Sequence, residues 1–158
     1  MAEQHEFRKP ADLPHKAAPE IVSGAGALAG TWNACDQATR NLVRIVIAPS
    51  GAEITVHAFG ACTPTPCDWG AVPGLLYAAD VSSTSAIAFT AQYRFSFSQV
   101  IVTGVLDNGS LIVETFTHFT DHSGRSDYYA KQYMCKARGC AQQNRWRYRE
   151  AERLRSIV

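Results

Sequence analysis

Hydrophobic side chains recur at every second position through most of the chain between residues 30 and 136. A period of two is the spacing of one face of a β-strand, whereas a helix repeats about every 3.6 residues. Clusters of Gly, Pro, Asn, Asp and Ser divide the pattern into short runs, as turns do. These runs predict eight strands, over residues 30–35, 41–49, 53–61, 75–81, 86–97, 99–106, 110–120 and 126–136.

No helical segment separates these runs, so consecutive strands are expected to pair antiparallel. Asn108 and Gly109 form a strong hairpin signal between the sixth and seventh runs. A meander that curls until its first and last strands meet has no free edge. We therefore predict an all-β fold, an eight-stranded antiparallel up-and-down barrel, with a β-sandwich as the alternative.

The two ends of the chain are expected to differ from the barrel. Residues 1–29 contain three prolines and few large apolar side chains, which predicts an extended arm. Residues after Cys140 contain neither Gly nor Pro, and a helix is predicted from about residue 141, within a barrel domain over 30–158. No secretory signal and no apolar run of membrane-spanning length is present, so we expect a cytoplasmic protein without a membrane partner.

Charge is balanced overall but uneven along the chain. The net charge is +1, yet residues 131–158 hold eight basic and two acidic residues, which leaves −5 for the remainder. The arginines of the predicted helix spread around its circumference, with Glu150 and Glu152 between them, so a nucleic-acid partner is not predicted. The helix is expected to be solvated or to dock on the acidic body of a neighbouring subunit.

Two of the predicted strands are apolar on both faces. In the sixth strand, Ile101 and Val105 oppose Val100 and Val102; in the seventh, Ile112 and Phe116 oppose Leu111 and Val113. The outer face of a soluble barrel is polar unless something covers it. We therefore expect a subunit interface, in a homo-oligomer or a larger complex, or the C-terminal segment, over these strands.

The first strand begins with Gly30-Thr31-Trp32, which resembles the Gly-x-Trp signature of the calycin superfamily, the group that includes lipocalins and avidins. The resemblance implies a calycin-like barrel in which Trp32 closes one end, the floor. It also implies a basic residue, Lys136 or Arg138, over that tryptophan, a helix after the last strand and a ligand inside the barrel.

Strand direction alternates in a meander, so the ends of the strands can be assigned to the two ends of the barrel. If Trp32 lies at the floor, the opposite rim collects Cys35, Arg40, the loop 60–70 and residues 118–125. The floor collects residues 135–140. This assignment separates the Cys62/Cys67 pair from the Cys135/Cys140 pair and argues against a four-cysteine zinc site.

The cysteines admit more than one chemistry. Without an export signal, five cysteines favour thiols or a metal site over disulfides. In the loop 60–70, however, a disulfide between Cys62 and Cys67, or between Cys35 and one of them, would staple a proline-rich loop, and Cys135 and Cys140 could likewise pin the start of the helix. We predict no cofactor; the alternative is zinc, held at the rim by Cys35, Cys62, Cys67, His118 and His122.

A ligand site is predicted at the rim and in the interior. Trp69 either stacks on a flat ligand or packs down as a lid, with Arg40 and Arg125 as charged contacts. The inward-facing aromatic residues either fill the core or line a cavity, to which Tyr77 and Tyr93 contribute hydroxyl groups. These residues are Tyr77, Phe89, Tyr93, Phe95 and Tyr129.

Glu114 and His118 alternate with Phe116 and form an acid/base pair if they face the interior, but the phase of the strand favours the outer face. The main functional hypothesis is binding of a small apolar or aromatic molecule inside the barrel. One alternative is a barrel enzyme, such as a cyclase or isomerase that acts by enclosing its substrate. Another is an assembly subunit that docks through its arm and basic helix.

Overall fold

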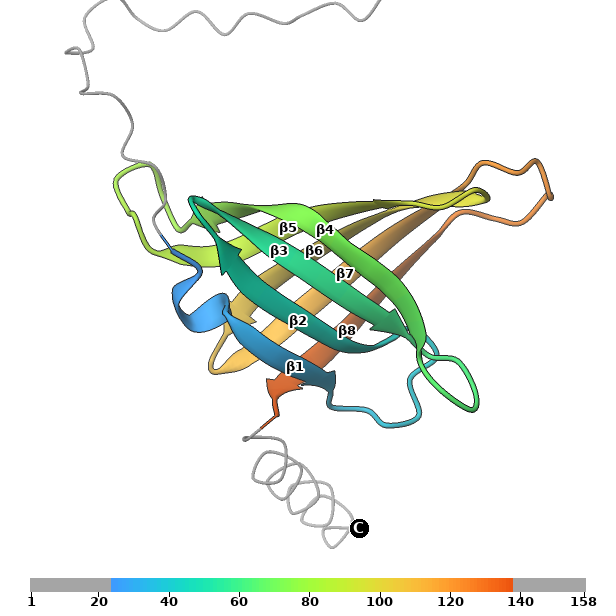
Figure 1. Ribbon diagram of the computed structural model, residues 1–158, viewed down its shortest axis with the longest axis horizontal. Helices are drawn as coiled ribbons and strands as arrows, with labels where there is room; N and C mark the ends of the chain where they lie inside the picture. The colour runs from blue at the N-terminus through green and yellow to red at the C-terminus, as the bar shows by residue number, and fades with distance from the viewer. Residues whose placement is uncertain (1–23, 138–158) are drawn as a thin grey trace, which may run out of the picture.

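The computed structural model describes residues 24–137, which form a closed barrel of eight antiparallel strands in which each strand pairs with the next and the last with the first (Figure 1). This confirms the predicted all-β up-and-down barrel and excludes the β-sandwich. The strands are β1 (Gly30–Ala34), β2 (Leu42–Ser50), β3 (Glu53–Gly60), β4 (Cys67–Ala78), β5 (Ala86–Arg94), β6 (Ser98–Asp107), β7 (Ser110–Phe119) and β8 (Tyr128–Lys136).

Strand β4 differs most from its prediction, because it begins at Cys67 and not at residue 75. Gly and Pro residues in this segment resemble turn signals in the sequence. In the structure, Gly70 has a positive φ of 80° and lies where the register between β3 and β4 shifts. Such an irregularity inserts an extra residue into one strand without ending it, so the strand continues through the expected loop.

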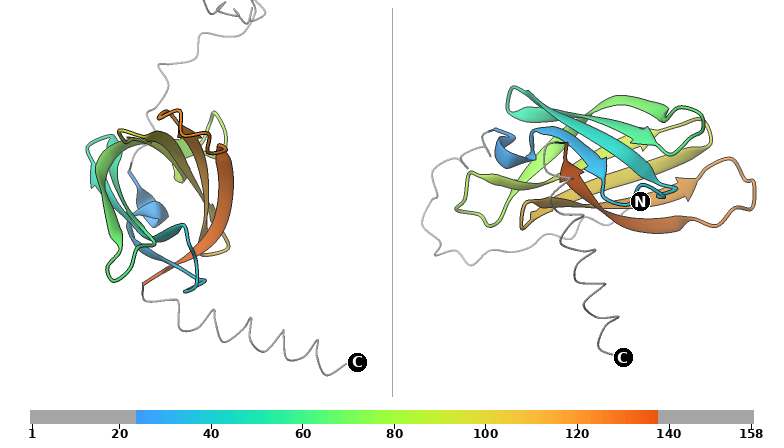
Figure 2. Two further views of the ribbon diagram at one scale, coloured as in Figure 1. Left: turned by 90° about the vertical axis from the view of Figure 1, so that its right-hand side faces the viewer. Right: turned by 90° about the horizontal axis from the view of Figure 1, so that it is seen from below.

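The floor of the barrel is closed by a short 3-10 helix, η1 (Gly26–Leu28), which Figure 2 (left) shows within the ring of strands. Leu28 is completely buried, and its carbonyl oxygen accepts a hydrogen bond from Trp32 Nε1 at 2.8 Å. Within the segment predicted as an arm, Ala25 and Leu28 belong to the barrel core. Residues 1–23 and the helix predicted from about residue 141 lie outside the described residues.

The other end of the barrel, which we call the mouth, collects the loops over residues 35–41, 61–66, 95–97 and 120–127 (Figure 1). Strands β3, β5 and β7 end there, as the alternation of direction predicted, whereas β1 stops at Ala34, short of the mouth. The floor collects η1 and the turns over 51–52, 79–85 and 108–109. The interior between them is packed with side chains, among them Trp32, Phe89 and Tyr93.

The outer face of β6 and β7 is apolar, as the sequence predicted. Ile101 and Phe116 are 45% and 47% exposed, and Val105 is exposed as well. Large apolar side chains that no other residue among 24–137 covers are unusual on the surface of a monomeric soluble protein. No helix among residues 24–137 is long and apolar enough to cross a membrane.

Candidate binding site at the barrel mouth

A ladder of aromatic rings runs from the interior to the mouth along β5 and the turn after it. Tyr93 and Phe95 are stacked with ring centroids 6.1 Å apart, and Phe95 and Phe97 are stacked at 5.8 Å. Their spacing of two along the chain puts the three rings on one side of the strand. Tyr93 is buried, Phe95 is half-buried and Phe97 is exposed at the rim, so the ladder connects core to solvent.

Trp69 stands edge-on against this ladder. Its ring centroid lies 5.5 Å from that of Tyr93 and 5.4 Å from that of Phe95, both in T-shaped contact. Gly60 on β3 leaves room for the indole, because a methyl group on that residue would lie 2.7 Å from Trp69 Nε1. Trp69 therefore packs down onto the core, as a lid residue would.

A pocket of about 390 Å³ opens beside Trp69 at the mouth. Its walls come from the start of β4, the β5–β6 turn, β6, β7, the β7–β8 loop and the start of β8. Most of the lining residues are aromatic or apolar, and the buried hydroxyl-bearing residues Ser98 and Thr117 supply polar atoms. The lining residues are Cys67, Asp68, Trp69, Phe95, Phe97, Ser98, Val100, Thr117, Phe119, Arg125 and Tyr128.

Arg125 covers one side of this pocket. Its guanidinium carbon lies 4.0 Å from the Phe119 ring centroid and 5.6 Å from that of Phe97, within the range of cation–π contact. The guanidinium also donates to Asp121, and its Nε donates to Ser123 Oγ at 2.8 Å. Hydrogen bonds from Ser123 and then from Arg125 hold the pKa of the Asp121 carboxyl below its usual range. Arg125 is thus held in place by its own loop.

Asp68 fixes the strand segment that carries Trp69. Its carboxylate lies 2.5 Å from His57 Nε2 and accepts a hydrogen bond from the Gly70 amide at 2.7 Å. Both contacts lower the pKa of Asp68, and the hydrogen bond with His57 has the larger effect. His57 in turn stacks on Phe59, with ring centroids 4.4 Å apart. The indole is therefore oriented by a network on the outer side of β3 and β4.

The Tyr93 hydroxyl is fully engaged by backbone and does not face the pocket as a free polar group. It donates to the Val56 carbonyl oxygen at 2.7 Å and accepts from the Ala58 amide at 3.1 Å. Burial raises the pKa of Tyr93 to about 12. The ring of Tyr93 contributes to the aromatic ladder, but its hydroxyl is not free for the ligand contact that the sequence predicted.

Two of the predicted interior tyrosines lie outside the barrel, so that part of the prediction is wrong. Tyr77 is 44% exposed and contacts the Thr90 hydroxyl, whereas Tyr129 is 52% exposed and donates to Glu114. The register explains both positions: Tyr77 pairs with Ala88 and Tyr129 with Phe116, which belong to the outer face. Phe89, by contrast, is buried in the core.

Arg40 is separated from Trp69 and Arg125. It lines a different cavity, of about 630 Å³, between the β1–β2 loop and β8. This cavity exists because β1 ends at Ala34, well short of the mouth, so that β8 lacks a strand partner there. The side-chain amide of Gln132 spans the space and hydrogen-bonds to the backbone N–H and C=O of Leu42. The predicted grouping of both arginines at one site is therefore wrong.

Glu114 and His118 face outwards, in agreement with the phase of the strand. Glu114 accepts the hydrogen bond from Tyr129, and His118 Nδ1 lies 2.6 Å from Asp127 Oδ2. The acid/base pair that these two residues would form in the barrel interior is therefore not formed. His122, in the β7–β8 loop, is exposed and has a positive φ of 54°.

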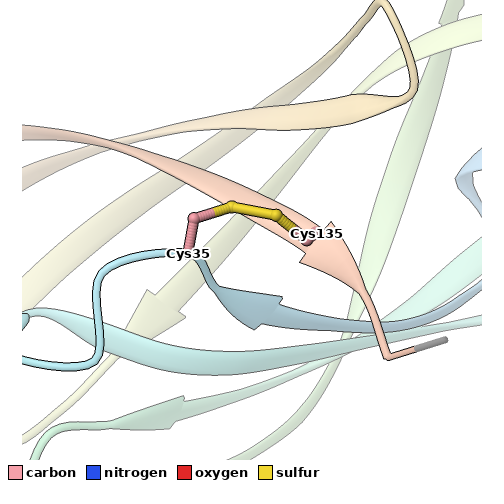
Figure 3. The surroundings of a disulfide bond; sticks show 2 residues. All are labelled: Cys35 and Cys135. Carbon is pink, nitrogen blue, oxygen red and sulfur yellow. A yellow bond between two sulfur atoms is a disulfide. The ribbon is translucent and has the colours of Figure 1, made fainter. Parts of the chain in front are cut away.

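Four of the five cysteines form two disulfides, so the expectation of thiols is wrong for them. The predicted Cys62–Cys67 bond is present. Cys35 is bonded to Cys135, with Cα atoms 5.9 Å apart, and this bond joins the first and last strands (Figure 3). Counting strand ends had put these two residues at opposite ends of the barrel, which fails because β1 is only five residues long.

These bonds also bear on the zinc alternative. Disulfide sulfurs lack the thiolate charge with which cysteine binds zinc, so the rim set Cys35, Cys62, Cys67, His118 and His122 is not a ligand set in this oxidation state. Cys35 is moreover held against β8. Among residues 24–137, no three His, Cys, Asp or Glu side chains are grouped so as to hold a metal ion.

The floor of the barrel has the contact that the Gly30-Thr31-Trp32 resemblance implied. Trp32 is 1% exposed, and Lys136 Nζ lies 5.2 Å from its ring centroid. Of the two basic residues proposed for this position, Lys136 occupies it as the last residue of β8. Arg138 lies outside the described residues.

Several residues of the pocket were not foreseen from the sequence. Ser98 and Thr117 share the phase of the buried residues of their strands, and this phase is the signal by which they could have been found. Phe97, Phe119 and Tyr128 lie at strand ends, where alternation gives little guidance.

Comparison of the chain with protein-family models, with curated proteins and with solved structures found no match.

Proposed function

We propose that the protein binds a small apolar or aromatic molecule in the pocket at the barrel mouth. The observation that carries the proposal is the ladder formed by Tyr93, Phe95 and Phe97, with Trp69 edge-on against it. Offset-stacked and T-shaped contacts are the arrangements that aromatic rings prefer. A planar ligand beside Phe97 and Trp69 would extend this existing arrangement.

The size and polarity of the pocket agree with this class of ligand. Its volume of about 390 Å³ lies in the lower part of the range of small-molecule sites, which is about 300 to 1,000 Å³. The hydroxyl groups of Ser98 and Thr117 would accept or donate one or two hydrogen bonds. Because Asp121 already pairs with Arg125, the proposal does not require an anionic ligand.

The calycin resemblance gives the proposal a second support. A barrel closed at one end by Trp32 under Lys136, with an aromatic pocket at the other end, has the layout of a lipocalin-like binding protein. Membership of that superfamily is part of the proposal. The assembly-subunit alternative depends on residues 1–23 and 138–158, which lie outside the described residues.

The test is a fluorescence titration of the full chain with anilinonaphthalene sulfonate, an aromatic probe whose emission rises in apolar surroundings. Trp69→Ala and Phe97→Ala each remove one aromatic wall. Each is expected to weaken probe binding up to about tenfold, since an aromatic contact contributes about 0.5–1.5 kcal/mol. Gly60→Ala, which displaces the indole without removing it, is expected to weaken binding as well.

The matched control is Tyr77→Ala, which removes an exposed aromatic ring from the outer face. It should bind the probe as the unmodified chain does. If all four variants bind equally well, the probe occupies another surface and the mouth pocket is not the site. Native mass spectrometry of the purified chain would then show whether any molecule is retained.

A further inference from the structure

The outer face of β5 to β8 carries three rows of side chains that the register aligns across the strands. We call this surface the outer sheet face. The first row is Gln92, Ile101, Phe116 and Tyr129, the second is Thr90, Thr103, Glu114 and Lys131, and the third is Ala88, Val105, Ile112 and Tyr133. The first and third rows are mainly apolar, and the second is polar.

The two apolar rows are largest and most exposed at β6, β7 and β8. Phe116 and Tyr129 contact each other with ring centroids 5.2 Å apart, and Ile101 and Val105 are exposed beside them. On β5 the same rows hold only Gln92 and Ala88. The face therefore projects furthest at β8, which carries Tyr129 and Tyr133, and least at β5.

We propose that the outer sheet face is a dimer interface with a second copy of this chain. A two-fold axis that runs along the strands between β6 and β7 places β6 over β7 of the other copy, and β5 over β8. Each row then meets the same row of the second copy. Ile101 packs on Phe116 and Val105 packs on Ile112, so the centre of the interface is apolar, as in stable interfaces.

The same axis matches tall side chains with short ones. Tyr129 of each copy lies over Gln92 of the other, and Tyr133 lies over Ala88. A hollow of about 400 Å³ lies between Gln92 on β5 and Tyr129 on β8, and it leaves room beside Gln92 for part of the Tyr129 side chain of the second copy. It also extends along the strands, where it is lined by Gln99, Thr117, His118, Asp127 and Tyr128. This complementarity of the face with itself is what selects a second copy as the occupant.

The charged residues select the direction of the axis. With the axis along the strands, Glu114 meets the Thr103 hydroxyl of the second copy and Lys131 meets the Thr90 hydroxyl. An axis at right angles to the strands would place Glu114 against Glu114 and Lys131 against Lys131, and buried like charges are destabilising. The Glu114 carboxylate also keeps its hydrogen bond from Tyr129 at 2.7 Å.

The size of the face indicates a weak dimer. The four strands β5 to β8, about 4.8 Å apart, and three rows about 6.8 Å apart give a face of roughly 19 by 20 Å. Two such faces bury roughly 800 Å², which is in the range of weak, transient contacts. The dimer is therefore expected to form only at high protein concentration.

Sedimentation velocity of the full chain over a range of concentrations tests the proposal. A reversible monomer–dimer equilibrium is expected. Ile101→Lys and Val105→Lys, both at exposed positions, are expected to leave the melting temperature nearly unchanged and to abolish the dimer. Ala48→Lys, exposed on β2, is the matched control and should dimerise normally.

A negative or a positive charge introduced at Thr90 tests the orientation of the two copies. Thr90 lies three strands from Lys131 in its own chain but opposite Lys131 of the second copy. Thr90→Glu should tighten the dimer and Thr90→Lys should weaken it, each by about three- to tenfold for two symmetric contacts, and added salt should reduce both effects. A chain that stays monomeric, or that dimerises unchanged with Lys at residues 101 and 105, would overturn the interface. Equal affinity of the two Thr90 variants would overturn the orientation, and with it the argument from charge.

Discussion

Cys35 is bonded to Cys135, and this bond fastens the first strand of the barrel to the last. The two residues are 100 positions apart in the sequence, and the backbone supports their approach, because the Cys35 amide donates to the Tyr133 carbonyl oxygen at 2.9 Å. The ladder between β1 and β8 is short, with only three residue pairs in register. The disulfide therefore reinforces the weakest seam of the barrel.

Removal of this disulfide is expected to be costly. In the chain-entropy description, a bond that closes a loop of 100 residues stabilises the folded state by about 4.7 kcal/mol, by restricting the unfolded chain. Cys35→Ala combined with Cys135→Ala should lower the free energy of unfolding by roughly that amount in urea titrations. Cys140 should be replaced by Ser in all variants, so that no thiol is left to exchange.

The second disulfide supplies the matched control. Cys62 and Cys67 close a loop of only five residues, for which the same relation gives about 2 kcal/mol. Cys62→Ala combined with Cys67→Ala should therefore cost less than half as much. If the two double variants were equally destabilised, loop closure would not be the source of the stabilisation.

Gly104 is expected to be intolerant of any side chain. A methyl group on this residue would lie 2.2 Å from Cε1 of Phe89, its register partner on β5, and Phe89 is buried in the core. Phe89 cannot retreat without displacing the packed interior. Gly104→Ala should lower the free energy of unfolding by about 1–3 kcal/mol, the usual range for overpacked cores.

The control for this prediction replaces Phe89 by the smaller Leu, which makes room for the methyl group introduced by Gly104→Ala. In the double variant Gly104→Ala with Phe89→Leu, the ring is absent, so the cost of the two changes should be less than the sum of the single costs. Strictly additive costs, measured by thermal or urea unfolding, would mean that the methyl group does not meet the Phe89 ring.

The order and direction of the strands could be predicted from the sequence because one physical rule determines them. Where one face is buried, side chains alternate with a period of two, and seven of the eight strands begin within two residues of their predicted starts. The rule failed at irregularities. Ile87 lies two residues before the buried Phe89, so the alternation assigns both to one face, yet Ile87 is exposed next to the register shift between Tyr77 and Ala78.

The candidate site was predictable only in part, for reasons that are also physical. Trp69 and Arg125 meet at the mouth because β3 and β7 end there, and this follows from strand order alone. The positions of Arg40 and Cys35 depend on the length of β1, which the alternation does not set. Whether Tyr129 lies inside or outside the barrel depends on its register with Phe116, a long-range pairing that local sequence does not encode.

Asp127 is expected to make the barrel less stable in acid. Hydrogen bonds, first from His118 and then from the Phe119 amide, lower the pKa of Asp127 below its ordinary value of 3.8. A carboxyl whose pKa is lower in the folded state stabilises the fold above its unfolded pKa, and this contribution is lost as the pH falls through the lower, folded value. In Asp127→Asn, the free energy of unfolding should therefore fall less steeply below pH 3.8 than in the unmodified chain.

The same measurement has an internal reference. Asp68 and Asp121 also have lowered pKa values, so the decline in acid should be reduced in Asp127→Asn but not abolished. NMR titration of the carboxyl carbons should show Asp127 changing charge below the usual range for aspartate. An ordinary titration at this residue would contradict the hydrogen bonds seen in the structure.

Tyr93 is expected to stabilise the barrel through its hydroxyl group and to make the barrel sensitive to strong base. In Tyr93→Phe, the Val56 carbonyl and the Ala58 amide lose their buried partner, which should lower the free energy of unfolding by about 1–3 kcal/mol. Tyr77→Phe, which removes an exposed hydroxyl that contacts Thr90, is the matched control and should cost much less.

The same residue makes the barrel sensitive to alkali. Burial raises the pKa of Tyr93 from 10.0 to about 12, so the fold favours the neutral phenol. That contribution is fully present below pH 10.0 and is lost as the pH rises through about 12. The ultraviolet absorbance of tyrosinate should therefore include a component that appears near pH 12 in the unmodified chain and is absent from Tyr93→Phe. Identical alkaline titrations of the two proteins would show that the Tyr93 hydroxyl is not held between Val56 and Ala58.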